Sequence, residues 1–105
     1  MTARPVMIWC PFADDGSGAQ AADTLLDEHL VACANILAPM RSLYRWDGER
    51  GEDTETGVLF KTDSERRDAV MARLAEIHPY GEPAILAWEC DAAPGTVAWL
   101  AKMGA

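Results

Sequence analysis

The sequence lacks a long apolar run, since no stretch approaches the roughly 20 residues that a membrane-spanning helix requires. Basic residues are also few: 9 Lys and Arg stand against 17 Asp and Glu, for a formal net charge of -8. A surface with this charge repels phosphate backbones and anionic lipids. We therefore expect no nucleic-acid partner and no membrane partner.

Cysteine is scarce, and the three cysteines, Cys10, Cys33 and Cys90, are far apart in the chain. An odd number without paired spacing argues against a disulfide framework. The motifs CxxC, HExxH, GxSxG and GxxxxGK[ST] do not occur, so the zinc, hydrolase and nucleotide sites that they mark are not predicted. The first residues do not have the layout of a signal peptide, which favours a cytoplasmic protein.

The composition is that of a folded globular protein. The 105 residues are 50% hydrophobic and 25% charged. A chain of this length holds one core, so we expect a single domain over residues 1–105.

The first half of the chain changes from strand-like to helical patterning. Pro5–Phe12 is nearly all apolar, as expected for a central strand covered on both faces. From Ala19 the apolar spacing is that of an amphipathic helix. The residues on its apolar side are Ala22, Leu25, Leu26, His29 and Leu30.

Residues 31–46 predict one long strand with a bend or bulge near Pro39. The Asp-Gly pair at 47–48 is a strong turn signal. We interpret the acidic stretch Glu49–Glu55 as a solvated hairpin tip and Thr56–Thr62 as the partner strand.

A second helix follows the hairpin. Asp63 or Ser64 can cap it, and Pro79 stops it. Pro83–Cys90 predicts a fourth strand, and Pro94 suits the first turn of a last helix. The apolar stripe of the second helix is Val70, Leu74 and Ile77, with Ala69 beside it.

The predicted order is β-α-β-β-α-β followed by a C-terminal helix. This order matches the α+β, ferredoxin-like, split β-α-β fold, with strands in the spatial order 4-1-3-2. The first and fourth strands are then neighbours. Cys10 on the first strand therefore lies beside the segment that enters the fourth, which contains His78 and Glu82.

A thiol, an imidazole and a carboxylate at one end of the sheet match soft or borderline cations such as copper and zinc. Binding needs a deprotonated Cys10 and a neutral His78, so affinity should fall at low pH. The simpler interpretation keeps Cys10 as a core residue and His78 as a helix-end residue that bonds C-terminal carbonyls. The spacing leaves both interpretations open.

Other candidate residues also have two interpretations. Lys61, beside three apolar residues, either reaches water at the strand end or pairs with a carboxylate or an anionic ligand. Tyr44 and Trp46 approach the same end of the sheet as Cys10, and are simplest as core or interface aromatics. A Cys–His pair can act as a nucleophile, but no orienting group or oxyanion element is evident, so we expect no enzyme.

Several segments together resemble the CutA divalent-cation tolerance family, over nearly the whole chain. The residues that carry the resemblance are Leu30–Ile36, Ser42–Gly48, Lys61-Thr62, His78-Pro79-Tyr80 with Pro83, and Ala98-Trp99-Leu100.

The resemblance implies a copper- or divalent-cation-tolerance protein. It implies a tight homotrimer with PII-like architecture, whose long hairpin extends to a neighbouring subunit. Cys10 and His78 stand where the family's copper ligands are placed. The chain departs from the family at Gly81, where many relatives carry an acidic or polar residue. Glu82 follows one position later and is the predicted third ligand.

A second hypothesis is a PII-like module that binds a small ligand or a partner protein between subunits, through Tyr44, Trp46, Lys61 and Tyr80. A third is a trimer whose stability or scaffold role matters more than any ligand. In every case we expect self-association and no cofactor required for folding.

Overall fold

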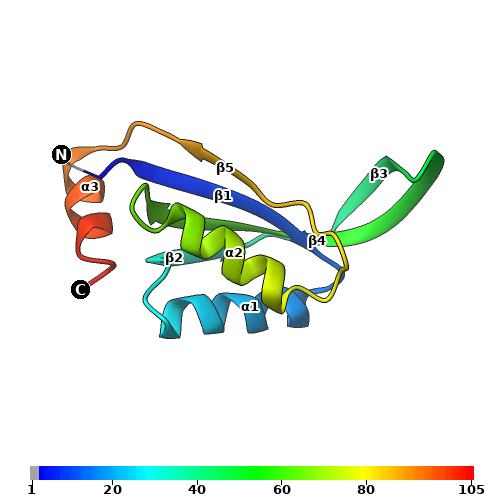
Figure 1. Cartoon of the computed structure of the whole chain (residues 1–105), viewed down its shortest axis with the longest axis horizontal. Coiled ribbons are helices and arrows are strands. Elements are labelled where there is room, and N and C mark those ends of the chain that lie inside the picture. The colour runs from blue at the N-terminus through cyan, green and yellow to red at the C-terminus, as the bar shows by residue number, and fades with distance from the viewer. Residues whose placement is uncertain (1–2) are drawn as a thin grey trace.

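The computed structural model describes residues 3–105, which form five strands and three helices (Figure 1). In chain order these are β1 (Pro5–Phe12), α1 (Asp15–Asp27), β2 (Cys33–Ile36), β3 (Met40–Trp46), β4 (Glu49–Asp63), α2 (Arg67–Ile77), β5 (Leu86–Glu89) and α3 (Pro94–Ala101). No helix within residues 3–105 is both long and apolar enough to cross a membrane.

The strands form one antiparallel sheet in the order β2-β4-β1-β5, and β3 pairs with the remaining half of β4. With β2 and β3 counted as one bent strand, this is the predicted order 4-1-3-2. The α+β, ferredoxin-like prediction is therefore confirmed. The β3–β4 hairpin projects from one end of the sheet, and α3 lies at the other end (Figure 1).

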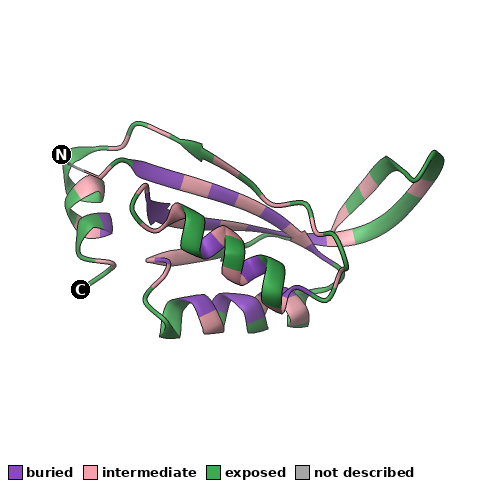
Figure 2. Cartoon of the chain, in the orientation of Figure 1, coloured by how far each residue is buried: buried purple, intermediate pink, exposed green. Residues whose placement is uncertain are grey.

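The core lies between one face of the sheet and helices α1 and α2. Residues alternate along β1, and Val6, Ile8, Cys10 and Phe12 are buried. Buried colour is concentrated on β1, on the half of β4 that pairs with it and on parts of α1 and α2 (Figure 2). Strand β4 adds Val58 and Phe60, and the predicted helix stripes add Leu25 from α1 and Val70 and Leu74 from α2. The opposite face of the sheet, which we call the outer face, carries no helix over most of its length.

Helix α1 begins and ends earlier than the spacing predicts. It starts at Asp15 because Asp14 caps it, its Oδ1 accepting the Ser17 N–H at 2.8 Å. It ends at Asp27, so His29 and Leu30 lie outside the helix. His29 has φ 58, a left-handed conformation that stops the helix.

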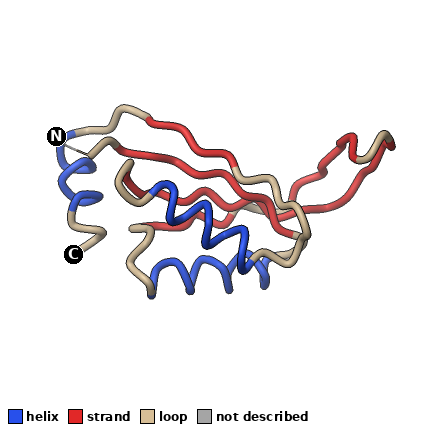
Figure 3. The backbone as a smooth tube through the Cα atoms, in the orientation of Figure 1, coloured by secondary structure: helices blue, strands red, loops and turns tan. Residues whose placement is uncertain are grey.

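The hairpin prediction is right about the turn and wrong about the tip. Asp47 and Gly48 have φ 51 and 79, as a tight hairpin turn requires. Glu49–Glu55, however, is not a loop: it forms the first half of β4 and pairs with all of β3, from Met40↔Glu55 to Trp46↔Glu49. The predicted bend is confirmed as the break between β2 and β3 (Figure 3).

Strand β5 is shorter than predicted. It covers only Leu86–Glu89 of the expected Pro83–Cys90, and the stretch before it is a loop. Pro79 and Pro83 lack the N–H that a ladder needs, which is consistent with this loop. The loop crosses the end of β1, so it decides where His78 and Tyr80 lie.

Candidate functional site

Cys10 and His78 meet at one backbone carbonyl. The Cys10 side chain points into the core and is fully buried, with Sγ 4.0 Å from the Pro11 oxygen. His78 follows the last residue of α2, and its Nε2 lies 2.8 Å from the same oxygen. The topology therefore brings these two predicted ligands together, as expected of neighbouring first and last strands.

The imidazole of His78 is enclosed on both of its nitrogens. A carbonyl only accepts, so Nε2 must carry the proton that it donates to Pro11. Nδ1 then accepts the backbone N–H of Tyr80 at 3.1 Å. The ring stacks on Phe12 with centroids 4.3 Å apart and planes 15° apart, and the Tyr80 ring lies 4.7 Å away.

The remaining ligand predictions do not complete a cation site. Glu82 is exposed, two residues beyond Tyr80. Burial, with help from the nearby Glu55 carboxylate, raises the pKa of the Cys10 thiol to about 12. Among residues 3–105, no group of three or more His, Cys, Asp or Glu can hold a metal ion. A cation ligand must offer a free lone pair, so the residues as arranged do not fit a divalent cation.

Glu55 is a residue that sequence reasoning did not single out. Its Oε2 accepts the Tyr80 hydroxyl at 2.9 Å. Burial, and then this bond, raise the pKa of Tyr80 to about 12. The next carboxylate along the hairpin, Asp53, accepts the hydroxyl of Tyr44. The one sequence feature that could have pointed to Glu55 is its position directly before the strand predicted to start at Thr56.

Lys61 lies far from the other predicted ligand-binding residues. It sits on the outer face of β4, between Met7 and Cys33 on the neighbouring strands. It lines a pocket of about 280 Å³ beside Asp91 and Thr96. Its ammonium has no ion-pair partner among residues 3–105.

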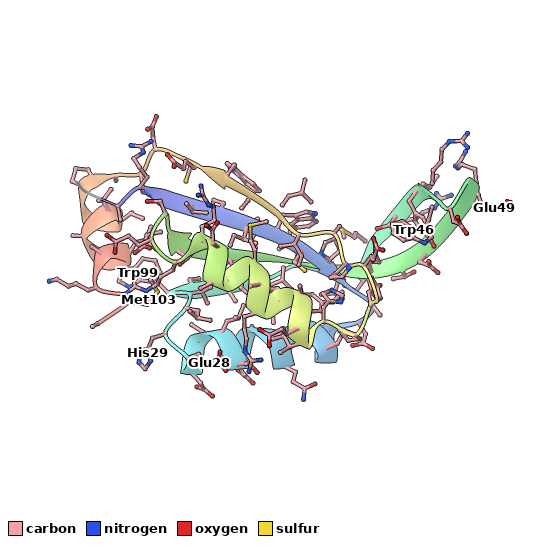
Figure 4. All side chains as sticks on the ribbon, in the orientation of Figure 1. Glu28, His29, Trp46, Glu49, Trp99 and Met103 are labelled. Atoms are coloured by element: carbon pink, nitrogen blue, oxygen red, sulfur yellow. The ribbon has the colours of Figure 1, made fainter. Side chains whose placement is uncertain are left out.

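The aromatic residues predicted to bind a small ligand together with Lys61, which are Tyr44, Trp46 and Tyr80, lie toward the hairpin end of the molecule. Trp46 stands out on the hairpin and is 59% exposed (Figure 4). Tyr44 lies across Gly51 on the same hairpin, and Tyr80 reaches its root through Glu55. A single chain therefore does not gather all four residues into one site.

The outer face of the sheet is apolar and open. On β1 and β5 the outward pairs are Met7↔Trp88 and Trp9↔Leu86. Trp88 is 46% and Leu86 54% exposed. Leu59 on β4 continues the same row, opposite Trp9. Large apolar side chains grouped on one face are typical of an interaction surface.

The chain is similar to known divalent-cation tolerance proteins over nearly its whole length. Residues 6–103 match the family model described as CutA1 divalent ion tolerance protein. The divalent-cation tolerance protein CutA of Pectobacterium atrosepticum is 36% identical over 90 residues, covering 82% of each chain. That of Pyrococcus horikoshii is 37% identical over 86 residues, covering 82% of this chain and 83% of the relative.

Solved structures give the same similarity in three dimensions. The structure of CutA from Synechococcus elongatus superimposes with a TM-score of 0.89 at 30% identity. The match covers 99% of this chain and 93% of that one.

Proposed function

Because this chain belongs to the CutA1 divalent ion tolerance family, we propose that it acts in divalent-cation tolerance as a homotrimer of PII-like architecture. The observation that carries the proposal is the open outer face. The helices cover one face of the sheet only, and Trp88 and Leu86 stand exposed on the other. Identical subunits are the simplest cover for such a face.

The hairpin supports the same proposal. It extends a molecule whose principal dimensions are 44 × 24 × 23 Å, and it is mostly exposed (Figure 2). Leu43, Tyr44 and Trp46 are 40–59% exposed there, with no core of their own chain to enter. A neighbouring copy provides a surface for them.

Association must offset the freedom of motion that each subunit loses. Burying one large apolar side chain contributes about 1.5–3 kcal/mol. Association costs on the order of 4–15 kcal/mol in lost freedom of motion. The outward residues of each subunit are already partly buried, so each supplies only part of this contribution, and the exposed side chains of the hairpin must add to theirs. The five outward residues are Met7, Trp9, Leu59, Leu86 and Trp88.

Light scattering after size exclusion tests the assembly. The wild-type chain is expected to elute as a trimer, and Trp88→Glu as a monomer, because a carboxylate on the outer face resists burial. Leu26→Glu is the matched control, since Leu26 is 39% exposed but lies on α1. A monomeric wild type, or dissociation by Leu26→Glu alone, contradicts the proposal.

The sequence predicts copper binding through Cys10 and His78. Cys10 and His78 supply a thiol and an imidazole, but the thiol is buried and the imidazole has both nitrogens engaged. We therefore derive no cation-binding step from this pair. Calorimetric titration of the assembled protein with copper measures whether other side chains bind the ion.

A second candidate function, a module that binds a small ligand, is favoured by the pocket beside Lys61. Within residues 3–105 the Lys61 ammonium has no ion-pair partner, and the pocket walls are largely apolar side chains. Thermal shift against a panel of small carboxylates and nucleotides tests it. The shift should disappear in Lys61→Met and persist in Lys102→Met, the variant of the only other lysine. A flat response across the panel contradicts this candidate.

We propose no catalytic activity and a cytoplasmic location. The Cys10 thiol is held neutral by burial, and the imidazole beside it presents a proton and no free base. A nucleophile needs a base that can accept its proton, and this pair has none. Cell fractionation with a tagged full-length chain tests the location.

A further inference from the structure

We infer that His78 and Tyr80 clamp the root of the β3–β4 hairpin to the end of β1, and that His78 does not bind a divalent cation in the folded protein. We call the contacts among Pro11, His78, Tyr80 and Glu55 the His78 clamp. Its consequence for assembly rests on the proposed homotrimer, while the clamp itself belongs to the single chain.

Both imidazole nitrogens of His78 already have partners within the chain. Nε2–H donates to the Pro11 oxygen at 2.8 Å, and Nδ1 accepts from the Tyr80 N–H at 3.1 Å. A neutral imidazole has one donor and one acceptor, so no lone pair is left for a cation. Coordination would require His78 to release Tyr80 or to surrender its proton and turn away from Pro11.

The His78 ring is also tightly packed. His78 is only 6% exposed, and its ring lies flat against buried Phe12. Cys10, the nearest soft donor, faces the core from the same strand and is 0% exposed. Histidines that bind metals instead present one nitrogen to the ion and bond the other to the protein. Here the protein takes both nitrogens.

The His78 clamp reaches β4 at the point where the hairpin leaves the sheet. Strand β1 ends at Phe12, which pairs with Thr56. Glu55 is therefore the first residue of the hairpin that has no β1 partner, where the sheet narrows to two strands. The Tyr80 hydroxyl binds Glu55 at this point. A two-stranded ribbon is only marginally stable by itself, so an added contact at its root fixes its direction.

The metal part of the inference is tested with Zn(II), which leaves NMR signals sharp. Long-range ¹H–¹⁵N spectra of the assembled wild type should show His78 protonated on Nε2. One equivalent of Zn(II) should leave both His78 nitrogens unshifted. His29, exposed beyond the end of α1, is the internal control for loose surface binding. A stoichiometric change of either His78 nitrogen, with His29 unchanged, overturns the inference.

The positioning part is tested by hydrogen exchange of the hairpin amides at residues 40–55. Tyr80→Phe removes one hydroxyl and should speed exchange there on the order of three- to tenfold, because a lost hydrogen bond is of that size. Glu55→Gln keeps an acceptor oxygen and should lie near wild type, whereas Glu55→Ala should match Tyr80→Phe. Exchange in α1 should stay unchanged.

The outcomes separate the clamp from the homotrimer. Unchanged hairpin exchange in Tyr80→Phe overturns the clamp, whatever the oligomeric state. A monomeric wild type whose hairpin exchange rises in Tyr80→Phe overturns the homotrimer and supports the clamp. If the His78 clamp and the homotrimer are both correct, Tyr80→Phe should also weaken the trimer, while Arg41→Gln should not. Arg41 pairs with Glu52 on the opposite face of the hairpin.

Discussion

At the residue scale, two glycines make room for aromatic rings on the outer face. A Cβ at Gly57 would overlap the Trp9 ring, and one at Gly51 would overlap the Tyr44 ring. The ring covers the glycine from the neighbouring strand, an arrangement that stabilises glycine within a sheet. Glycine is therefore required at both positions, because the aromatic ring lies too close to the backbone for a Cβ.

Gly57→Ala is expected to destabilise the fold by about 1–3 kcal/mol, since the added methyl forces Trp9 out of its position. Gly95→Ala is the control, because a Cβ there meets nothing within 4 Å. In helix α3 it should be neutral or stabilise by up to about 1 kcal/mol. Urea unfolding of both variants measures the two stabilities. Equal unfolding midpoints would contradict the expected destabilisation by Gly57→Ala.

The Cys10 thiol predicts a pH dependence of stability. Its pKa is about 12 in the folded chain and about 8.5 in an unfolded one. The folded state thus holds a proton that the unfolded state loses above pH 8.5. The stabilisation is complete below that pH and falls as pH rises toward 12.

Cys10→Ala should remove this slope, which is at most about 1.4 kcal/mol per pH unit for one proton. Urea unfolding at intervals from pH 8 to pH 10.5 measures the difference between the variant and wild type. Cys33→Ala serves as the matched control and should keep the wild-type slope. Parallel curves for wild type and Cys10→Ala would contradict the assignment.

The candidate site could be predicted from the sequence in position but not in chemistry. Strand order alone places Cys10 beside the segment that contains His78. Whether His78 offers a lone pair depends on the path of the loop after α2, because the backbone of Tyr80 and the carbonyl of Pro11 take its two nitrogens. No residue pattern encodes that path. Glu55 was missed for the same reason, since its partner Tyr80 is 25 residues away.

At the scale of elements, Asp63 organises the start of α2. It is 3% exposed, its Oδ1 accepts the Arg66 N–H at 3.0 Å, and its Oδ2 lies 2.7 Å from the Arg66 guanidinium. The sequence predicts Asp63 or Ser64 as the helix cap, but Arg66 holds the N-cap position without a side-chain cap hydrogen bond, and Asp63 stabilises the turn before the helix. The helix itself begins at Arg67.

Asp63→Ala should cost about 1–2 kcal/mol, since it removes one of the two acceptors of the Arg66 N–H and breaks a partly buried ion pair. Asp63→Asn keeps the acceptor and should cost less. Asp68→Ala, which removes an exposed carboxylate one turn later, should stay within about 0.5 kcal/mol of wild type. Thermal unfolding of the three variants tests this ranking, and an Asp68→Ala cost equal to that of Asp63→Ala would contradict it.

The sequence predicts helices and strands that bury one face against the core. It does not predict strands that are exposed to solvent on both faces. The stripe of α2 and the alternation of β1 follow from the core that they face. Glu49–Glu55 belongs to a two-stranded ribbon with solvent on both sides, so its acidic residues carry no apolar alternation to mark a strand.

At the scale of the whole molecule, the apolar run of β1 pointed to a strand covered on both faces. The single chain covers only one, through α1 and α2. Met7 and Trp9 on the other face are half-buried by their own sheet neighbours. The sequence therefore specifies an apolar surface that residues 3–105 of a single chain leave open, and this is the surface that the proposed trimer would cover.

The proposed trimer predicts that thermal stability depends on protein concentration. Unfolding of a trimer releases three chains, so mass action raises Tm as the total concentration rises. For a domain of this size we expect a rise on the order of 4 °C for each tenfold increase. Trp88→Glu, with a charge on the outer face, should show a Tm independent of concentration, whereas Leu26→Glu should keep the wild-type dependence. Differential scanning calorimetry over a hundredfold range of concentration separates these cases. A constant wild-type Tm would mean that the outer face of a single chain stays open to solvent, and the homotrimer would have to be abandoned.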